Sequence, residues 1–232
     1  MATERTAKKA VEKAKKDEEM IRIRSQIELW MARNHLPDNL KERIITCIQH
    51  KLEKNNDIDM DKPMSHLSKD LITEIKHRLC LPLLKNVVQN LENQGGQNLS
   101  ERICEYLKPK YYAENIYILQ EGQPLIEMVF ITQGSVWCFK GSNGHESDHI
   151  NTFELYGEEL VKSWLNRHYP SLKELPTSTK TVKTESKVEA FALMASDLKH
   201  LVPKHTRAAK AVKDFAHEVI GRLSIKENAP KS

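Results

Sequence analysis

Apolar residues in the first part of the chain recur at the spacing of amphipathic helices. The first run begins at residue 20, ends at Pro37 and contains Ile23, Ile27, Trp30 and Met31. A second run, residues 38–52, repeats the pattern at Leu40, Ile44, Ile45, Ile48 and Leu52. Residues three and four apart lie on one face of a helix, so the pattern predicts two helices, each with one buried side.

A third helical stretch is predicted over residues 67–84. Its apolar positions are Leu67, Leu71, Ile75 and Leu79. Its basic positions lie mostly elsewhere: Lys69, Lys76, His77 and Arg78. Asp70 and Glu74 dilute this charge, so we interpret the basic positions as a solvated face and not as a lipid-headgroup site.

The middle of the chain changes to a strand pattern. Residues 111–139 are rich in β-branched and aromatic side chains and are interrupted by Gly122 and Gly134, which indicates short strands joined by glycine turns. Residues 188–193 predict another strand, and residues 100–107 a short helix with Ser100 as its N-cap. The whole pattern predicts an α+β fold.

The two ends of the chain have different compositions. Residues 1–19 are mostly Ala, Lys and Glu with few positions to bury, which predicts a charged leader that frays. Beyond Pro203, residues 204–223 predict a basic amphipathic helix with apolar positions at Val212, Phe215, Val219, Ile220 and Leu223. We expect residues 225–232 to be a disordered tail.

The candidate chemistry lies in residues 155–160 and 175–182. Gly157 turns the chain into a short helix, so the amides of Glu158, Glu159 and Leu160 are expected to lack intrahelical partners and to attract an anion. A carboxylate beside a bound phosphate suits recognition of a sugar hydroxyl, a role we assign to Glu158. The candidate ligand-binding residues are Gly157, Glu158, Glu159, Leu160, Thr179, Lys180 and Thr181.

Several phrases resemble the cytosolic part of plant cyclic-nucleotide-gated cation channels, in the order of that family. They are LPDNLKERI from Leu36, LSKDLITEIKHRLCLPLLKNV from Leu67, ERICEYLKPKYY from Glu101, ILQEGQPLIEMVFITQG from Ile118, YGEEL from Tyr156 and LPTSTKTVKTESKVEAFALMASDLKHLV from Leu175. The resemblance implies a helical C-linker over residues 20–98. It also implies a cyclic-nucleotide-binding domain over residues 99–224, a jelly-roll-like β-roll with flanking helices.

The resemblance also implies a function. The module would bind cGMP or cAMP and no other cofactor, and would transmit binding through the C-linker to a pore, at the cytoplasmic face of the plasma membrane. Its partners would be channel subunits in a homo- or hetero-oligomer. Residues 197–224 would either bind calmodulin or form a helix that packs on the domain with a solvated outer face. The apolar spacing of residues 20–52 alone suits helices that cover their own core equally well.

Three departures from the family pattern support an alternative, a degenerate fold that binds nucleotide poorly and acts as a protein-interaction platform. Lys180 stands where the family usually has arginine, so we expect weakened phosphate binding. Phe153-Glu154-Leu155 stands where the family usually has Gly-Asp-Phe, and the bulky Phe153 is expected to distort a strand end near the pocket. Residues 89–98 are polar and contain glycine, which predicts looser docking between linker and binding domain.

Composition excludes several other classes. A net charge of +4 with interspersed signs does not demand nucleic acid, and four separated cysteines without a CxxC pair predict reduced thiols and no zinc site. His145 and His149 are interpreted as exposed loop histidines. No catalytic spacing suggests an enzyme.

No run reaches about 18 apolar residues, the length that a membrane-spanning helix requires. We therefore expect the pore to have been lost, removed or supplied by another chain.

Overall fold

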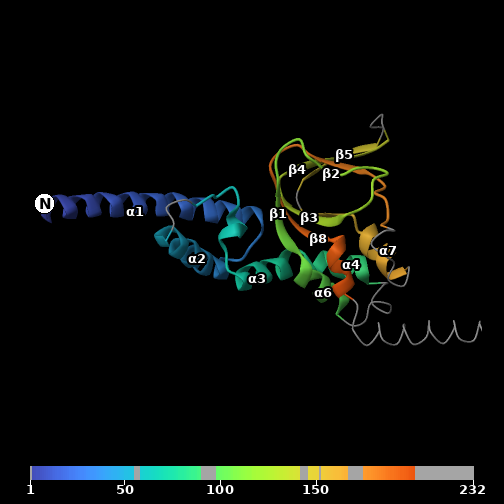
Figure 1. The fold of residues 1–232 in the computed structure, drawn as a ribbon, viewed down its shortest axis with the longest axis horizontal. Helices are drawn as coiled ribbons and strands as arrows, with labels where there is room; N and C mark the ends of the chain where they lie inside the picture. Colours follow the sequence, from blue (N-terminus) through green and yellow to red (C-terminus); the bar gives the residue numbers. More distant parts are fainter. Residues whose placement is uncertain are drawn as a thin grey trace, which may run out of the picture.

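The computed structural model describes residues 2–54, 58–89, 98–141, 146–151, 153–166 and 175–201. Helices occupy the first part of the chain and strands most of the second (Figure 1). This arrangement confirms the predicted α+β class.

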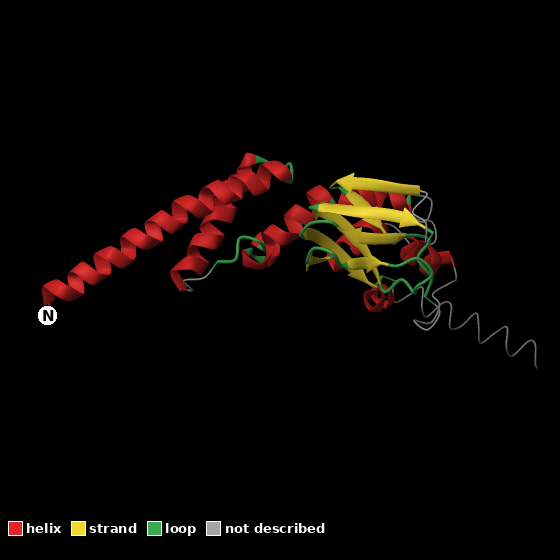
Figure 2. Ribbon diagram, turned by 90° about the horizontal axis from the view of Figure 1, so that it is seen from above, coloured by secondary structure: helices red, strands yellow, loops and turns green. Residues whose placement is uncertain are grey.

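The helical segment, as we name residues 2–89, begins with a hairpin of α1 and α2 (Figure 2). Its elements are α1 (Ala2–Arg33), the 3-10 helix η1 (Asp38–Leu40), α2 (Lys41–Lys54), the 3-10 helix η2 (Pro63–His66), α3 (Lys69–Leu79) and α4 (Leu81–Val88). The apolar positions of both predicted helices are buried, with Ile23, Ile27 and Ile48 fully inaccessible. Packing within one chain therefore explains the apolar spacing of residues 20–52, as expected for helices that cover their own core.

Two helix predictions differ from the structure. Residues 2–19 are helical and continuous with the rest of α1, although the sequence predicts a frayed leader from their lack of buried positions. The predicted helix over residues 67–84 is divided at Cys80, where α3 ends and α4 begins. Pro82, in the first turn of α4, lacks the amide hydrogen that a continuous helix would use.

The β-roll follows the short helix α6 (Leu99–Tyr106), which opens at Asn98 with no side-chain cap. Ser100 lies inside α6 and is buried, so its predicted N-cap role is wrong. The described strands and helices of the roll are β1 (Lys108–Tyr112), β2 (Tyr117–Leu119), β3 (Glu127–Gln133), β4 (Ser135–Lys140), β5 (Glu146–Asn151), β6 (Glu154–Tyr156), α7 (Glu159–Asn166), β7 (Thr181–Thr184), β8 (Val188–Met194) and η3 (Ala195–His200).

The described strands form two antiparallel four-stranded sheets, in the orders β1-β8-β3-β6 and β2-β7-β4-β5. Phe130 of β3 lies opposite Phe191 of β8 at the centre of the first sheet, and both are almost fully buried. Strands β3 and β8 are buried at nearly every position, because one face looks into the roll and helices cover the other (Figure 1). The apolar side chains of residues 188–193 reflect this burial, and Glu189 is the one charged residue among them.

Candidate functional site

A tight turn at Gly157 joins β6 to α7. Gly157 has a φ of 78°, a conformation that glycine adopts without steric cost. Strand β6 pairs with β3 through Tyr156 and Val129, which brings the turn against the backbone of a central strand. A Cβ atom on Gly157 would lie 2.8 Å from the Glu127 carbonyl oxygen. Both the conformation and the close approach therefore require glycine here.

The amides that follow Gly157 are only partly available to an anion. The Leu160 amide donates to the Gly157 carbonyl at 3.0 Å, so the prediction that this amide is available to an anion is wrong. The amides of Glu158 and Glu159 donate to no backbone carbonyl in the described residues, as expected for the first turn of a helix. The anion-binding capacity of this turn rests on these two donors.

The second candidate segment, residues 175–182, is held against the loop between β2 and β3. The Ser178 amide donates to the Gln123 carbonyl at 2.9 Å, and the Gly122 amide donates to the Ser178 carbonyl at 2.9 Å. The Leu125 amide donates to the Pro176 carbonyl at 2.8 Å. These backbone bonds set the position at which β7 begins.

The two segments meet through side chains. Thr179 Oγ1 donates to Glu159 Oε1 at 2.9 Å, and Lys180 Nζ lies 4.8 Å from the ring centroid of the buried Tyr156. Lys180 forms no ion pair with a carboxylate in the described part of the chain. The fold thus brings residues separated by about twenty positions to one place and holds a lysine there on an aromatic ring.

Two other candidate side chains have partners but keep hydrogen-bonding capacity. Glu158 is 30% exposed and forms an ion pair of 3.6 Å with Lys162, one helical turn further on. Thr181 is buried, and its Oγ1 accepts a hydrogen bond of 3.1 Å from the Glu121 amide. A carboxylate can accept further bonds and a threonine hydroxyl still has its proton to donate, so both side chains retain the capacity that a ligand would need.

Phe153 lies immediately before β6 in a left-handed backbone conformation, and the predicted distortion of the strand end stays a prediction. It has a φ of 69°, and its amide donates to the Ile131 carbonyl at 2.8 Å. Its ring lies 5.3 Å, centroid to centroid, from that of His35, which follows α1 and also has a positive φ of 49°. Sequence analysis missed this contact between the helical segment and the roll, because 118 positions separate the two residues and no local pattern links them.

The structure describes one of the two predicted loop histidines and places it in a strand. His149 lies within β5, opposite Trp137, so the prediction of a loop at this position is wrong. His145 lies outside the described residues.

Comparison with known proteins identifies relatives of this site and of the helices before it. No protein-family model matches the chain. Cyclic nucleotide-gated ion channel 1 of Arabidopsis thaliana is 37% identical over 194 residues, 82% of this chain and 26% of the channel. Putative cyclic nucleotide-gated ion channel 8 of the same plant is 38% identical, over 82% of this chain and 25% of the channel. Protein CNGC15c of Medicago truncatula is 37% identical, over 79% of this chain and 26% of that protein.

The chain is homologous to a segment of plant cyclic nucleotide-gated ion channels. It spans about a quarter of the length of the curated channels it matches. A solved structure, the cNMP-binding domain of an Arabidopsis thaliana cyclic nucleotide-regulated ion channel, is 35% identical. That match covers 48% of this chain and 82% of the domain, with a TM-score of 0.41. These relatives are named as ion channels and not as enzymes.

None of the helices in the described residues is sufficiently long and apolar to cross a bilayer.

Proposed function

We propose that this chain is a cyclic-nucleotide-binding regulatory module of a ligand-gated cation channel. The observation that carries the proposal is the meeting of the Gly157 turn with the segment that contains Thr179 and Lys180. One place thereby combines backbone donors, a basic side chain and a carboxylate. These are the groups that a cyclic phosphate and its sugar require. The homology to plant channels supports this reading of the site.

Each group has a defined task in this proposal. The amides of Glu158 and Glu159 would donate to the cyclic phosphate, while the Lys180 ammonium would supply a positive charge. The Thr181 hydroxyl would add a donor, and Glu158 would accept a hydrogen bond from the ribose hydroxyl. Both cAMP and cGMP carry these phosphate and ribose groups, so the base is not selected by them.

The helical segment would transmit binding to a pore as the C-linker at the cytoplasmic face of the plasma membrane. Binding shifts a conformational equilibrium only through different affinities for its states. Helix α1 retains the exposed apolar residues Val11, Ile21 and Leu29, which suit contact with another channel subunit, identical or different. The proposed calmodulin segment, residues 197–224, is described only over residues 197–201, so that hypothesis stays a prediction.

The first test is isothermal titration calorimetry of the purified chain with cGMP and with cAMP. We expect saturable heat with at least one nucleotide and its loss in Glu158→Ala, because that variant cannot accept the ribose hydroxyl. Glu101→Ala, at an exposed position of α6, is the matched control and should bind as the wild type does. Heat that persists unchanged in Glu158→Ala would contradict the role of this carboxylate.

Lys180→Arg is expected to tighten nucleotide binding. A guanidinium contacts two phosphate oxygens at once, whereas an ammonium is a strongly hydrated point charge. One additional charge-assisted hydrogen bond of roughly 1 to 3 kcal/mol corresponds to about one to two decades in Kd. The same titration measures it, with Lys183→Arg, at the one half-buried position of β7, as the control. An unchanged or weaker affinity would refute this interpretation of position 180.

A second candidate function is a protein-interaction platform on a degenerate nucleotide-binding fold. The observation that favours it is that several recognition groups already have intramolecular partners. The Leu160 amide is used by Gly157, Glu158 pairs with Lys162, and Lys180 lies on Tyr156. Absence of heat with both nucleotides at millimolar concentration would select this function over the first.

A further inference from the structure

The helical segment and the β-roll meet around a cavity of about 570 Å³, away from the Gly157 turn. Trp30 of α1 lines one side, and Tyr111 of β1 and Glu189 of β8 line the other. The loop before η2, through Met60 and Lys62, completes the wall. Any change in the distance between the helical segment and the roll must alter this junction.

Glu189 is a buried carboxyl at this junction, with 5% of its surface exposed. Its Oε2 accepts a hydrogen bond of 2.7 Å from Trp30 Nε1, which ties β8 to α1 across 159 positions of sequence. Its Oε1 is buried and has no hydrogen-bond partner of ordinary geometry in the described part of the chain. A charged carboxylate in this position would lack both water and a complete set of donors.

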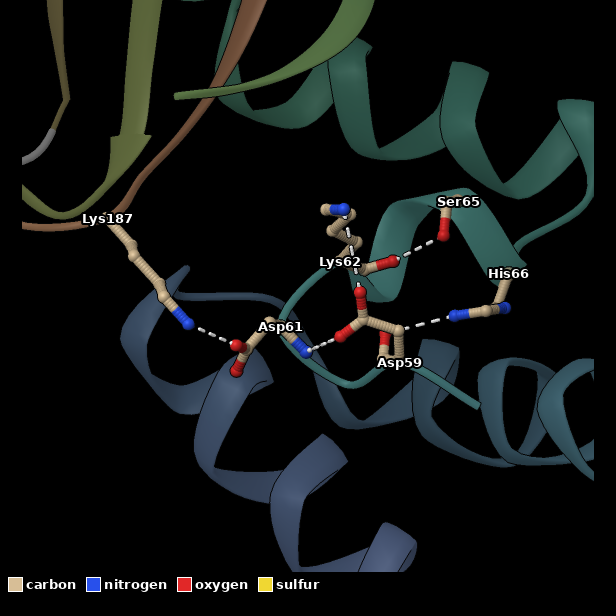
Figure 3. A network of polar contacts seen from close by, with 6 residues as sticks. All are labelled: Asp59, Asp61, Lys62, Ser65, His66 and Lys187. Carbon is tan, nitrogen blue, oxygen red and sulfur yellow. Dashed lines mark hydrogen bonds and ion pairs between the residues drawn. The ribbon is translucent and has the colours of Figure 1, made fainter. Parts of the chain in front are cut away.

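The charged groups around the cavity leave this carboxyl without a cation. Lys187, in the turn before β8, forms an ion pair with Asp61 (Figure 3). Lys62 pairs with Asp59 at 3.7 Å (Figure 3), and Arg33 is exposed. No ion pair joins any of these cations to Glu189 in the residues that the structure describes.

The uncharged side chains around the cavity compensate for a negative charge only in part: the Tyr111 hydroxyl lowers the pKa of Glu189, but by less than burial raises it. Burial raises the pKa of the Tyr111 and Tyr112 hydroxyls, so both stay neutral. Gln133 lies opposite Glu189 in the sheet, and its Oε1 is also buried without a hydrogen-bond donor. An amide oxygen cannot donate to a carboxylate, so this atom does not compensate a negative charge on Glu189.

We infer that Glu189 is a proton-operated clasp: its uncharged carboxyl holds α1 against β8, and its ionisation favours separation of the helical segment from the β-roll. Burial raises the pKa of Glu189 to about 7, against the opposing effects of the Trp30 indole and the Tyr111 hydroxyl. Separation would hydrate the carboxylate and return the pKa toward its ordinary value of about 4.3. The closed junction therefore binds the proton more tightly, so acid closes it.

The same linkage gives the sign of the effect on stability. Between the ordinary pKa and about 7, the folded chain holds a proton that the unfolded chain has released. The stabilising contribution of the protonated acid is complete at low pH and is lost as the pH rises through about 7. In the full range, this residue changes the unfolding equilibrium constant on the order of 10²-fold.

The first experiment compares urea unfolding of the wild-type chain and Glu189→Gln from pH 5 to pH 8.5, without nucleotide. Glutamine keeps the shape and the acceptor for Trp30 but cannot ionise. The wild-type unfolding constant should rise with pH on the order of 10²-fold more than that of the variant. Glu53→Gln, at an exposed position of α2, is the matched control and should follow the wild type. Parallel profiles for the wild type and Glu189→Gln would overturn the inference.

A second measurement separates a clasp from a buried acid that merely titrates. Solvent exchange of the Trp30 indole proton, followed by NMR, should be faster in the wild type than in Glu189→Gln at pH 8 and equal at pH 5.5. Equal exchange at pH 8 would show that ionisation does not open the junction. Trp30→Phe removes a donor that favours the ionised form of Glu189. The midpoint of the pH dependence of urea unfolding should therefore move to higher pH in this variant. An unchanged midpoint would overturn the assigned contact.

These experiments do not depend on the proposed function, because they use the chain without nucleotide. Loss of nucleotide binding would leave the clasp intact as a pH response of the fold. Failure of the clasp would equally leave the calorimetric test of the Gly157 site unaffected.

Discussion

Gly157→Ala is expected to abolish binding of cGMP and cAMP and to lower the free energy of unfolding by about 2 to 4 kcal/mol. The new Cβ atom would lie 2.8 Å from the Glu127 carbonyl oxygen and 3.3 Å from the Met128 Cα. Both atoms belong to the backbone of β3, so no side-chain rotation relieves the clash. The turn would have to move, and the two amides that follow it would move with it. Urea unfolding and calorimetric titration measure the two effects.

Gly122→Ala is the matched control for this prediction. Gly122 has almost the same conformation, with a φ of 76°, but a Cβ atom there would meet nothing within 4 Å. Only the backbone strain of a left-handed alanine remains, which costs about 1 kcal/mol. Equal losses in the two variants would mean that the close approach to β3 contributes nothing to stability, contrary to our prediction.

Lys76→Met is expected to lower the free energy of unfolding by about 2 to 3 kcal/mol. Lys76 is 5% exposed, and its Nζ donates to the Glu105 carbonyl at 2.9 Å and to the Leu107 carbonyl at 3.0 Å. These carbonyls lie where α6 ends and β1 is about to begin, so the ammonium caps a helix C-terminus and joins α3 to the roll. Methionine fills a similar volume but donates to neither oxygen. Chemical denaturation at neutral pH measures the loss.

Lys85→Met controls for the removal of a lysine charge. Lys85 is exposed on α4, and substitution there should change stability by less than about 0.5 kcal/mol. Were both variants equally stable, the two hydrogen bonds of Lys76 would be shown to contribute little. Lys76 would then contribute no more to stability than a lysine on a solvated face, as its sequence position suggests.

The sequence pattern predicts Lys76 on a solvated face, whereas the structure buries it, which shows what helical periodicity can and cannot predict. The apolar spacing of residues 67–79 places one side of α3 in the core, and Leu71 and Ile75 are buried as predicted. Lys76 lies beside that side, where packing against α6 covers its aliphatic stem and brings two carbonyl oxygens to its ammonium. A lysine stem buries readily when its charged end has acceptors. Those acceptors come from residues about thirty positions away, which no helical pattern reports.

The candidate site around Gly157 divides in the same way. The Gly157 turn and the helix after it are local features, so glycine followed by a helical pattern was enough to predict them. The hydrogen bond from the Leu160 amide to the Gly157 carbonyl is also local. It depends on the geometry of the first helical turn, which residue types do not specify. The contacts of Thr179 with Glu159 and of Lys180 with Tyr156 depend on how β7 is held against the loop between β2 and β3.

By itself, the sequence determined the α+β class, the two amphipathic helices and the glycine turn, because each arises from side-chain spacing or backbone freedom over a few residues. Only the tertiary structure decided the burial of Lys76 and the buried junction of Trp30 with Glu189. The physical reason is that burial and hydrogen-bond partners are set by strand register and helix docking. These bring together residues far apart in the chain, and their energies outweigh local propensity.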